Sequence, residues 1–169
     1  AVAGSASAVG AAECPWDRYR IARRGNTVAL LGLGDAFPLA VDAAGLLASD
    51  GTNPVTATVV DPRRYDALDR STLDTLAADH RVVVTVEDGQ LEGGWGEKIT
   101  AYYADRAATD GTRHSPVVVN VGAGKEFTDR VPVAELRERY GMTPERITAR
   151  VRAALAQRSP ETQGTQPST

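Results

Sequence analysis

Apolar residues occur in short continuous runs that alternate with longer stretches of helical spacing. Four runs are apolar on both faces, and they predict buried strands at residues 27–33, 55–60, 82–86 and 117–121. Apolar positions three or four apart predict helices over residues 36–49, 71–79, about 97–107, 133–140 and 144–157. Ser71 and Thr143 are the expected N-caps of two of these helices, and Pro144 is the expected first residue of the last one.

Strands that are apolar on both faces require helices on both sides of their sheet. The alternating order therefore predicts an α/β protein, a three-layer α/β/α fold with a mostly parallel sheet. The residues that follow the strands then meet at one edge of the sheet, where we expect Gly34, Asp61, Glu87 and Gly122. Any bound molecule or chain is expected outside this edge.

The two ends of the chain differ from the middle in composition. Residues 1–19, which are rich in small residues, are predicted to be a flexible leader, and residues 20–156 are predicted to be the folded domain. The polar residues 157–169 are predicted to be a disordered tail. The leader lacks the basic region and leucine-rich run of a secretory signal, and no apolar run approaches the roughly 20 residues of a membrane helix. We therefore expect a cytoplasmic protein without a membrane partner.

The charge balance and the few Cys and His residues exclude several classes of function. The chain has 19 Lys and Arg against 22 Asp and Glu, a net charge of −3, and no basic stripe, so we expect no nucleic-acid partner. The single cysteine, Cys14, rules out a disulfide scaffold, and the two histidines form no H-x-x-x-H or H-E-x-x-H pattern. No metal site is predicted.

The glycine pairs after two of the predicted strands do not form a phosphate-binding motif. Gly32 and Gly34 lack the third glycine of a dinucleotide fingerprint, because Phe37 occupies its position. The run Gly122 to Lys125 lacks both the spacing of a Walker loop and the Ser or Thr after its lysine. Tight turns between strand and helix explain these glycines, so no cofactor-binding residue and no catalytic residue is assigned.

The loop after the third predicted strand carries the most distinctive pattern. Glu87 and Asp88 leave a buried strand, and the cluster Gly93-Gly94-Trp95-Gly96 precedes the next helix. Two interpretations of the carboxylates remain open: a catalytic acid/base pair, or acceptors for loop amides and the helix start, which we favour. Trp95 is predicted to be partly buried at a contact with another chain or domain, since rigid aromatic residues are enriched at such contacts.

Several segments resemble one enzyme family in their order along the chain. They are residues 24–34, 59–69, 80–88, 93–96, 117–127 and 135–143. Over about residues 20–156 the chain is similar to the carboxyl-terminal domain of transketolase-like thiamine-diphosphate enzymes, most closely 1-deoxy-D-xylulose-5-phosphate synthase. Ala67 departs from the proline of the family pattern V-D-x-R-x-x-x-P-L-D, and residues 130–132 depart from the family's His-Gly-Ser.

The resemblance implies a transketolase C-terminal-domain-like fold and a chain that is not catalytic alone. In the family, thiamine diphosphate and Mg bind to two further domains, and a two-carbon unit passes from pyruvate to glyceraldehyde 3-phosphate. This chain would bind no cofactor by itself. It would be the third domain or a separate small subunit, and its partners would be the domains or subunit with the thiamine-diphosphate site, in a homodimer or hetero-oligomer.

The loops at the carboxyl ends of the strands are expected to form the interface with those partners. The residues expected there are Asp61, Arg63, Arg64, Tyr65, Glu87, Asp88, Gly93, Gly94, Trp95, Gly96, Lys125 and Phe127.

Two alternative functions use the same strand ends. In the first, the chain is a stand-alone regulatory module that binds a small anion through Arg63, Arg64 and Lys125. In the second, it is the equivalent domain of a 2-oxo-acid dehydrogenase component, which shares the fold and a glycine-rich loop after the third strand. The stretch from Phe127 to Thr143 favours the synthase.

Overall fold

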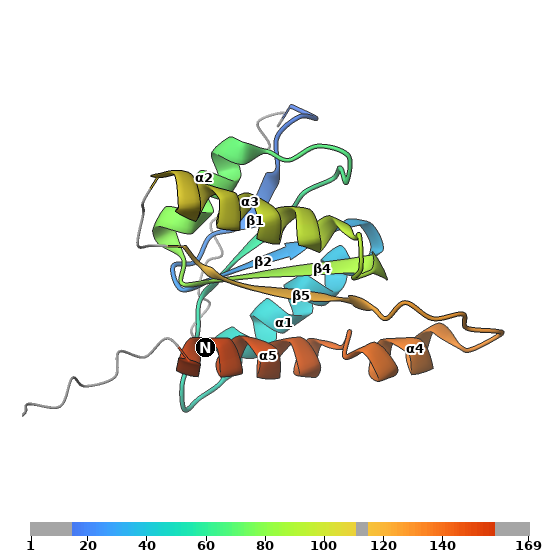
Figure 1. Cartoon of the computed structure of the whole chain (residues 1–169). Helices are drawn as coiled ribbons and strands as arrows, with labels where there is room; N and C mark the ends of the chain where they lie inside the picture. The colour runs from blue at the N-terminus through green and yellow to red at the C-terminus, as the bar shows by residue number, and fades with distance from the viewer. Residues whose placement is uncertain (1–14, 111–114, 158–169) are drawn as a thin grey trace, which may run out of the picture.

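The computed structural model describes residues 15–110 and 115–157, which form a five-stranded sheet between two layers of helices (Figure 1). The strands are β1 (Arg20–Arg23), β2 (Val28–Gly32), β3 (Ala57–Asp61), β4 (Val82–Gln90) and β5 (Val117–Ala123). The helices are α1 (Phe37–Ser49), preceded by the short 3₁₀ helix η1 (Gly34–Ala36), α2 (Arg70–Asp79), α3 (Trp95–Asp110), α4 (Val133–Tyr140) and α5 (Pro144–Gln157). The expected tail from residue 158 onward and leader residues 1–14 lie outside the described residues.

The sheet has the order β1-β3-β2-β4-β5, and every pair except β1 with β3 is parallel. The predicted fold, a three-layer domain with a mostly parallel sheet, is confirmed. Only β1 was missed. Its four residues include only two apolar ones, the adjacent Ile21 and Ala22, so its extended form depends on pairing with β3 and not on a local pattern.

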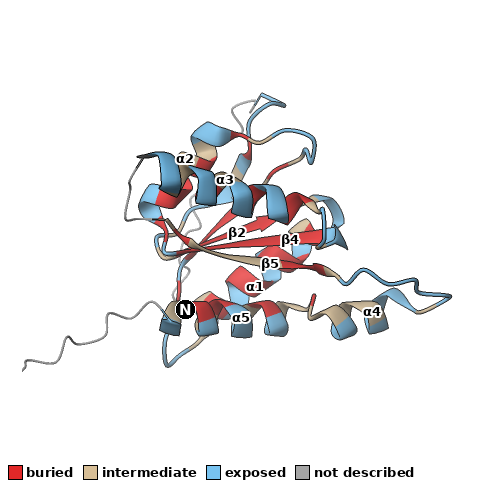
Figure 2. Cartoon of the chain, in the orientation of Figure 1, coloured by how far each residue is buried: buried red, intermediate tan, exposed pale blue. Residues whose placement is uncertain are grey.

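The two helical layers bury separate cores on the two faces of the sheet. Helices α1 and α5 pack against one face, and α2 and α3 against the other. All five residues of β2 are buried, and Figure 2 shows buried residues concentrated in the sheet and on the helix faces turned toward it. This burial explains why the central strands read as continuous apolar runs.

The carboxyl ends of the parallel strands meet at one edge of the sheet, as predicted. In the strand register Gly32 pairs with Val86, Val86 pairs with Val121, and Leu31 pairs with Val60. We call this the carboxyl edge. It brings together the loops that follow β2, β3, β4 and β5.

Asp69, and not Ser71, is the N-cap of α2, so this prediction was wrong. The Asp69 carboxylate accepts hydrogen bonds from the Thr72 backbone N–H at 3.1 Å and from the Thr72 hydroxyl at 2.5 Å. Ser71 instead lies within the first turn of the helix. The predicted cap of α5 is confirmed, because the Thr143 hydroxyl accepts from the Arg146 N–H at 3.4 Å.

The ionised form of Asp69 should stabilise the domain. Burial raises the pKa of Asp69, but hydrogen bonds from Thr72 and from the Tyr19 N–H, together with the Arg18 charge, outweigh burial and hold the pKa below its usual value. A pKa that is lower in the folded state stabilises the fold above the unfolded-state pKa, and this contribution is lost as the pH falls.

We expect Asp69→Asn to lower the free energy of unfolding by about 2 kcal/mol at pH 7, because the carboxylate charge and one of its two acceptor oxygens are lost. The difference between the native chain and the variant should shrink as the pH falls below about 4. Urea denaturation at pH 7 and pH 3 measures both effects. A difference that stays the same at the two pH values would contradict this account.

Candidate functional site at the carboxyl edge

Glu87 ends the buried part of β4 and turns its carboxylate toward the start of α3. Oε2 accepts a hydrogen bond from the Trp95 backbone N–H at 2.9 Å, and Oε1 accepts one from the Gly96 N–H at 2.8 Å. These amides have no partner inside the helix, and a negative charge there interacts favourably with the helix dipole. The prediction that Glu87 accepts backbone hydrogen bonds in its own domain is therefore confirmed. Asp88 is exposed, so the two carboxylates do not share one environment.

Close packing explains two glycines of the cluster. A Cβ atom at Gly94 would lie 2.7 Å from Oε1 of Glu87, and one at Gly96 would lie 2.5 Å from the Thr85 hydroxyl oxygen and 2.9 Å from Oδ1 of Asn120. All three distances are shorter than ordinary van der Waals contacts. The cluster thus lets α3 begin directly against Glu87 and the sheet.

A polar network beneath α3 was missed at the sequence level. The Thr85 hydroxyl donates to Oδ1 of Asn120 at 2.8 Å, and Nδ2 of Asn120 donates to the Thr100 hydroxyl at 2.9 Å. Thr85 and Asn120 are register partners on β4 and β5. A polar residue inside each of two apolar strands was the available signal, but the pairing of the strands was needed to join them.

Trp95 lies in the core of its own domain, so it is more deeply buried than the predicted partly buried residue at a contact with another chain or domain. The residue is only 3% exposed, and its ring packs on Tyr19 with 6.5 Å between the ring centroids. Since α3 begins at Trp95 and lies against the sheet, the indole points into the core shared by α2 and α3. This side chain is therefore not available to a partner in the described fold.

A hollow of about 500 Å³ opens at the carboxyl edge between the ends of β2 and β4. Its lining includes Asp35, Tyr65, Asp88 and Lys98. Tyr65 is 68% exposed, and the Lys98 ammonium donates to the Tyr65 carbonyl oxygen at 3.2 Å. In the sheet, β3 lies on one side of β2 and β4 lies on its other side. The hollow therefore lies at the point where the strand order reverses.

The three cations expected to contact a small anion do not converge. Arg63 donates to backbone carbonyl oxygens, Arg64 forms an ion pair with Asp66 at 2.6 Å, and Lys125 forms one with Glu92 at 2.8 Å. The hydrogen bond from Arg64 lowers the pKa of Asp66 to about 2. Each of the three side chains therefore has an acceptor within the chain, and the structure does not assemble the anion site.

The segment after β5 projects past the sheet and returns through α4 (Figure 1). Phe127 on this segment is fully exposed, Val133 is 62% exposed, and α4 has no buried residue. The Tyr140 hydroxyl donates to Glu126 at 2.6 Å and ties the helix to the segment. We call residues 124–140 the arm. It presents Phe127 and Val133 outside the core, and its ribbon in Figure 2 is pale blue and tan, the colours of exposed and intermediate residues.

The other residues expected at the interface lie at the same edge with different exposure. Asp61 is half-buried and accepts from the Arg20 guanidinium at 3.0 Å, whereas Gly93 is exposed and has a positive φ of 74°. The structure thus brings the ends of β3 and β4 together, and it places Lys125 and Phe127 on the arm. Contact of any of these residues with a partner stays a prediction.

A comparison with protein families identifies the domain. The family model for the transketolase C-terminal domain matches residues 17–147. The chain belongs to the transketolase C-terminal domain family.

Curated relatives of this family are similar over most of the chain. The 1-deoxy-D-xylulose-5-phosphate synthase of Symbiobacterium thermophilum is 34% identical over 141 residues, which cover 83% of the chain and 20% of that protein. The synthase of Carboxydothermus hydrogenoformans is 30% identical over 155 residues, which cover 89% of the chain and 24% of that protein. The chain spans about a fifth of the length of these relatives.

Solved transketolase structures share the fold. A split-gene transketolase, described as an inactive beta4 tetramer, matches with a TM-score of 0.71 and 29% identity over 85% of this chain and 44% of that chain. The transketolase of Leishmania mexicana matches with a TM-score of 0.56 and 21% identity over 89% of this chain and 19% of that chain, which supports the fold alone.

The described residues offer no cluster of side chains for a metal ion such as Mg²⁺. Mg²⁺ binds through carboxylate and other oxygen ligands. Residues 15–110 and 115–157 contain no group of three or more His, Cys, Asp or Glu side chains that could hold a metal ion. In the same part of the chain, no helix is both long and apolar enough to cross a membrane.

Proposed function

We propose that this chain is the third domain, or a separate small subunit, of a transketolase-type thiamine-diphosphate enzyme, with a role in assembly and not in the chemical step. The observation that carries the proposal is the family match over residues 17–147. The chain that contains this match spans only a fifth of the length of its curated relatives. The complete enzyme would transfer a two-carbon unit from pyruvate to an aldehyde in the cytoplasm, like the synthases that the chain resembles.

The geometry of the carboxyl edge supports a structural role. Glu87, the carboxylate in the most distinctive loop, is occupied by two amides of α3, and packing accounts for Gly94 and Gly96. The solved relative described as an inactive beta4 tetramer is an example of a related chain that assembles without activity. The carboxyl edge and the arm are the surfaces proposed for contact with the partner, as a homodimer or hetero-oligomer. The regulatory-module alternative has less support, because its three cations are separately paired.

Reconstitution tests this proposal. The partner to test is a protein with the two missing domains, encoded by a neighbouring reading frame. We expect calorimetric titration with thiamine diphosphate and Mg²⁺ to show no binding to this chain alone, and activity to appear only after the two proteins are mixed. Micromolar cofactor binding by the chain alone would overturn the domain assignment.

Phe127→Ala in the same experiment tests the arm. Loss of an exposed aromatic anchor should weaken assembly by about 2 kcal/mol, roughly thirtyfold in affinity, without changing the melting temperature. Glu145→Ala, an exposed position at the start of α5, is the control and should leave the affinity unchanged. An affinity that Phe127→Ala leaves unaltered would remove the arm from the interface.

A further inference from the structure

The turn formed by residues 15–19, which we call the entry turn, is held by side chains from the loop between β3 and α2. The sequence assigned these residues to the flexible leader, yet Tyr19 is buried in the core beside Trp95. A hydrogen bond from the Arg18 backbone N–H to the Pro15 carbonyl oxygen, at 3.0 Å, closes the turn itself. A single hydrogen bond within the turn does not hold the turn against the rest of the domain. Contacts with the loop between β3 and α2 are therefore needed to hold it.

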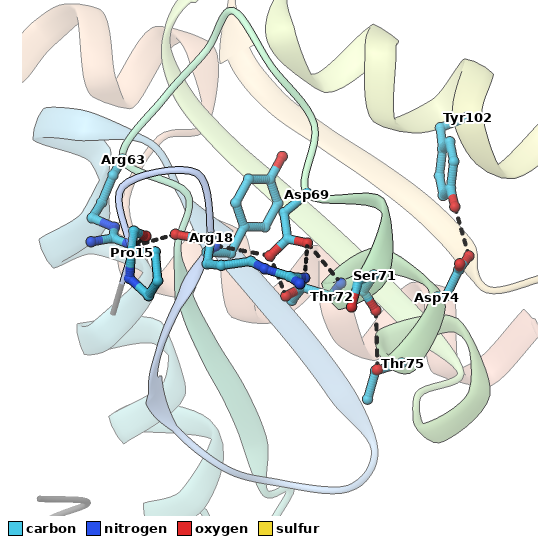
Figure 3. A network of polar contacts seen from close by, with 10 residues as sticks. Pro15, Arg18, Arg63, Asp69, Ser71, Thr72, Asp74, Thr75 and Tyr102 are labelled. Atoms are coloured by element: carbon cyan, nitrogen blue, oxygen red, sulfur yellow. Dashed lines mark hydrogen bonds and ion pairs between the residues drawn. The ribbon is translucent and has the colours of Figure 1, made fainter. Parts of the chain in front are cut away.

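Arg63 provides the first set of contacts. Its guanidinium donates to the Pro15 carbonyl oxygen at 2.7 Å and to the Arg18 carbonyl oxygen, and it stacks over the Trp16 ring at 5.2 Å from the centroid. Figure 3 shows Arg63 reaching from its loop to the turn. Arginine suits this task, because a planar guanidinium can donate to two acceptors and stack on an aromatic face at once.

Asp69 provides the second set of contacts from the other end of the loop. Oδ2 accepts from the Tyr19 backbone N–H at 3.0 Å, and Oδ1 accepts from the Arg18 guanidinium at 3.2 Å. Figure 3 shows the contact of Asp69 with Arg18 beside those that Asp69 makes with Thr72 at the start of α2. A single carboxylate therefore joins the entry turn to a helix N-terminus.

The backbone of Arg63 indicates that its side chain is needed in place. Its φ of 60° lies in the left-handed region, which is unfavourable for a residue with a Cβ atom and easy for glycine. The Arg63 N–H donates to Oδ1 of Asp61 at 3.0 Å, which holds this conformation at the end of β3. A glycine would form the same turn without strain, but it would have no guanidinium.

We infer that the loop from Asp61 to Asp69 is a clamp for the entry turn, with Arg63 as a positioning residue that holds Tyr19 against Trp95 at the carboxyl edge. The clamp binds main-chain groups: carbonyl oxygens through Arg63 and an N–H through Asp69. It thereby holds the entry turn next to the carboxyl edge and fixes where the chain enters the domain. This role goes beyond the proposed assembly function and does not depend on it.

Substitution of Arg63 by glycine separates the clamp from a simple turn, because the two roles predict opposite results. If Arg63 is a clamp, Arg63→Gly should release the entry turn, and the amides of Arg18 and Tyr19 should exchange at least about tenfold faster in NMR hydrogen exchange. If Arg63 is only a turn residue, relief of the backbone strain should leave this exchange unchanged or slow it and raise the melting temperature. That result would overturn the inference.

Arg130→Gly is the matched control, since Arg130 also has a positive φ, 46°, but lies on the arm. It should change exchange in the entry turn by less than about twofold, and an equal effect of both substitutions would overturn the inference. Arg63→Asn is the second variant, because asparagine tolerates the left-handed conformation and also lacks the guanidinium. Global unfolding of both Arg63 variants would place Arg63 in the global fold and would equally reject a local clamp.

Discussion

We expect Trp95→Ala to lower the free energy of unfolding by about 3–5 kcal/mol, the range for loss of a fully buried large aromatic side chain. The indole is 3% exposed and packs on Tyr19 in the core between the sheet and the layer of α2 and α3. Its removal leaves a cavity that the start of α3 cannot fill, because the helix is held there through the Trp95 and Gly96 amides. Chemical denaturation of the isolated chain measures the loss.

Trp16→Ala is the control for this prediction, because Trp16 is the other tryptophan of the chain and is 75% exposed. Its loss removes a stacking contact with Arg63 and should cost about 1 kcal/mol or less. If Trp95→Ala instead left the chain as stable as Trp16→Ala does and weakened assembly, the indole would belong to an interface after all.

The second large effect is expected for Glu87→Ala, which should cost about 3 kcal/mol of unfolding free energy. The substitution leaves the buried N–H groups of Trp95 and Gly96 without their acceptor, and each hydrogen bond to a charged group contributes about 1.5–3 kcal/mol. It also removes a negative charge from the N-terminus of α3. Glu87→Gln should cost less, because its amide oxygen can still accept one of the two bonds.

Asp88→Ala is the control at the neighbouring position, where the side chain is exposed, and should change stability by about 0.5 kcal/mol or less. In the reconstituted enzyme, Glu87→Gln should leave the chemical step within about tenfold, roughly 1.4 kcal/mol of barrier. A loss of turnover on the order of a thousandfold with assembly and melting temperature intact would mean that Glu87 takes part in catalysis.

The local pattern of apolar residues was sufficient to predict the core of the fold. The predicted helices over residues 133–140 and 144–157 have the observed bounds, and the four predicted strands correspond to β2, β3, β4 and β5. The strands and α5 bury apolar residues on the faces turned toward the core, so burial dictates the spacing of their apolar residues. Helix α4 forms without a buried residue. The hydrogen bonding of Glu87 was also predictable, since a carboxylate that leaves a buried strand needs donors.

Residues whose roles depend on distant partners were not predictable in the same way. Strand β1 has almost no apolar pattern, and its extended form comes from β3, about forty residues further along the chain. Asp69 is the cap of α2 because it also receives the Tyr19 N–H, a contact between residues 50 positions apart. No property of Ser71 or Asp69 alone distinguishes the two as caps.

The sequence by itself determined the α/β class, the mostly parallel sheet and the meeting of the strand ends at one edge, because periodicity records which faces are buried. It also carried the order of segments by which the family resemblance was found. Only the tertiary structure decided that Trp95 faces inward, that Arg63, Arg64 and Lys125 are separately paired, and that residues 15–19 belong to the domain. The physical reason is that an aromatic ring or a charged group finds its partner through space, and the local spacing of residues does not encode that partner.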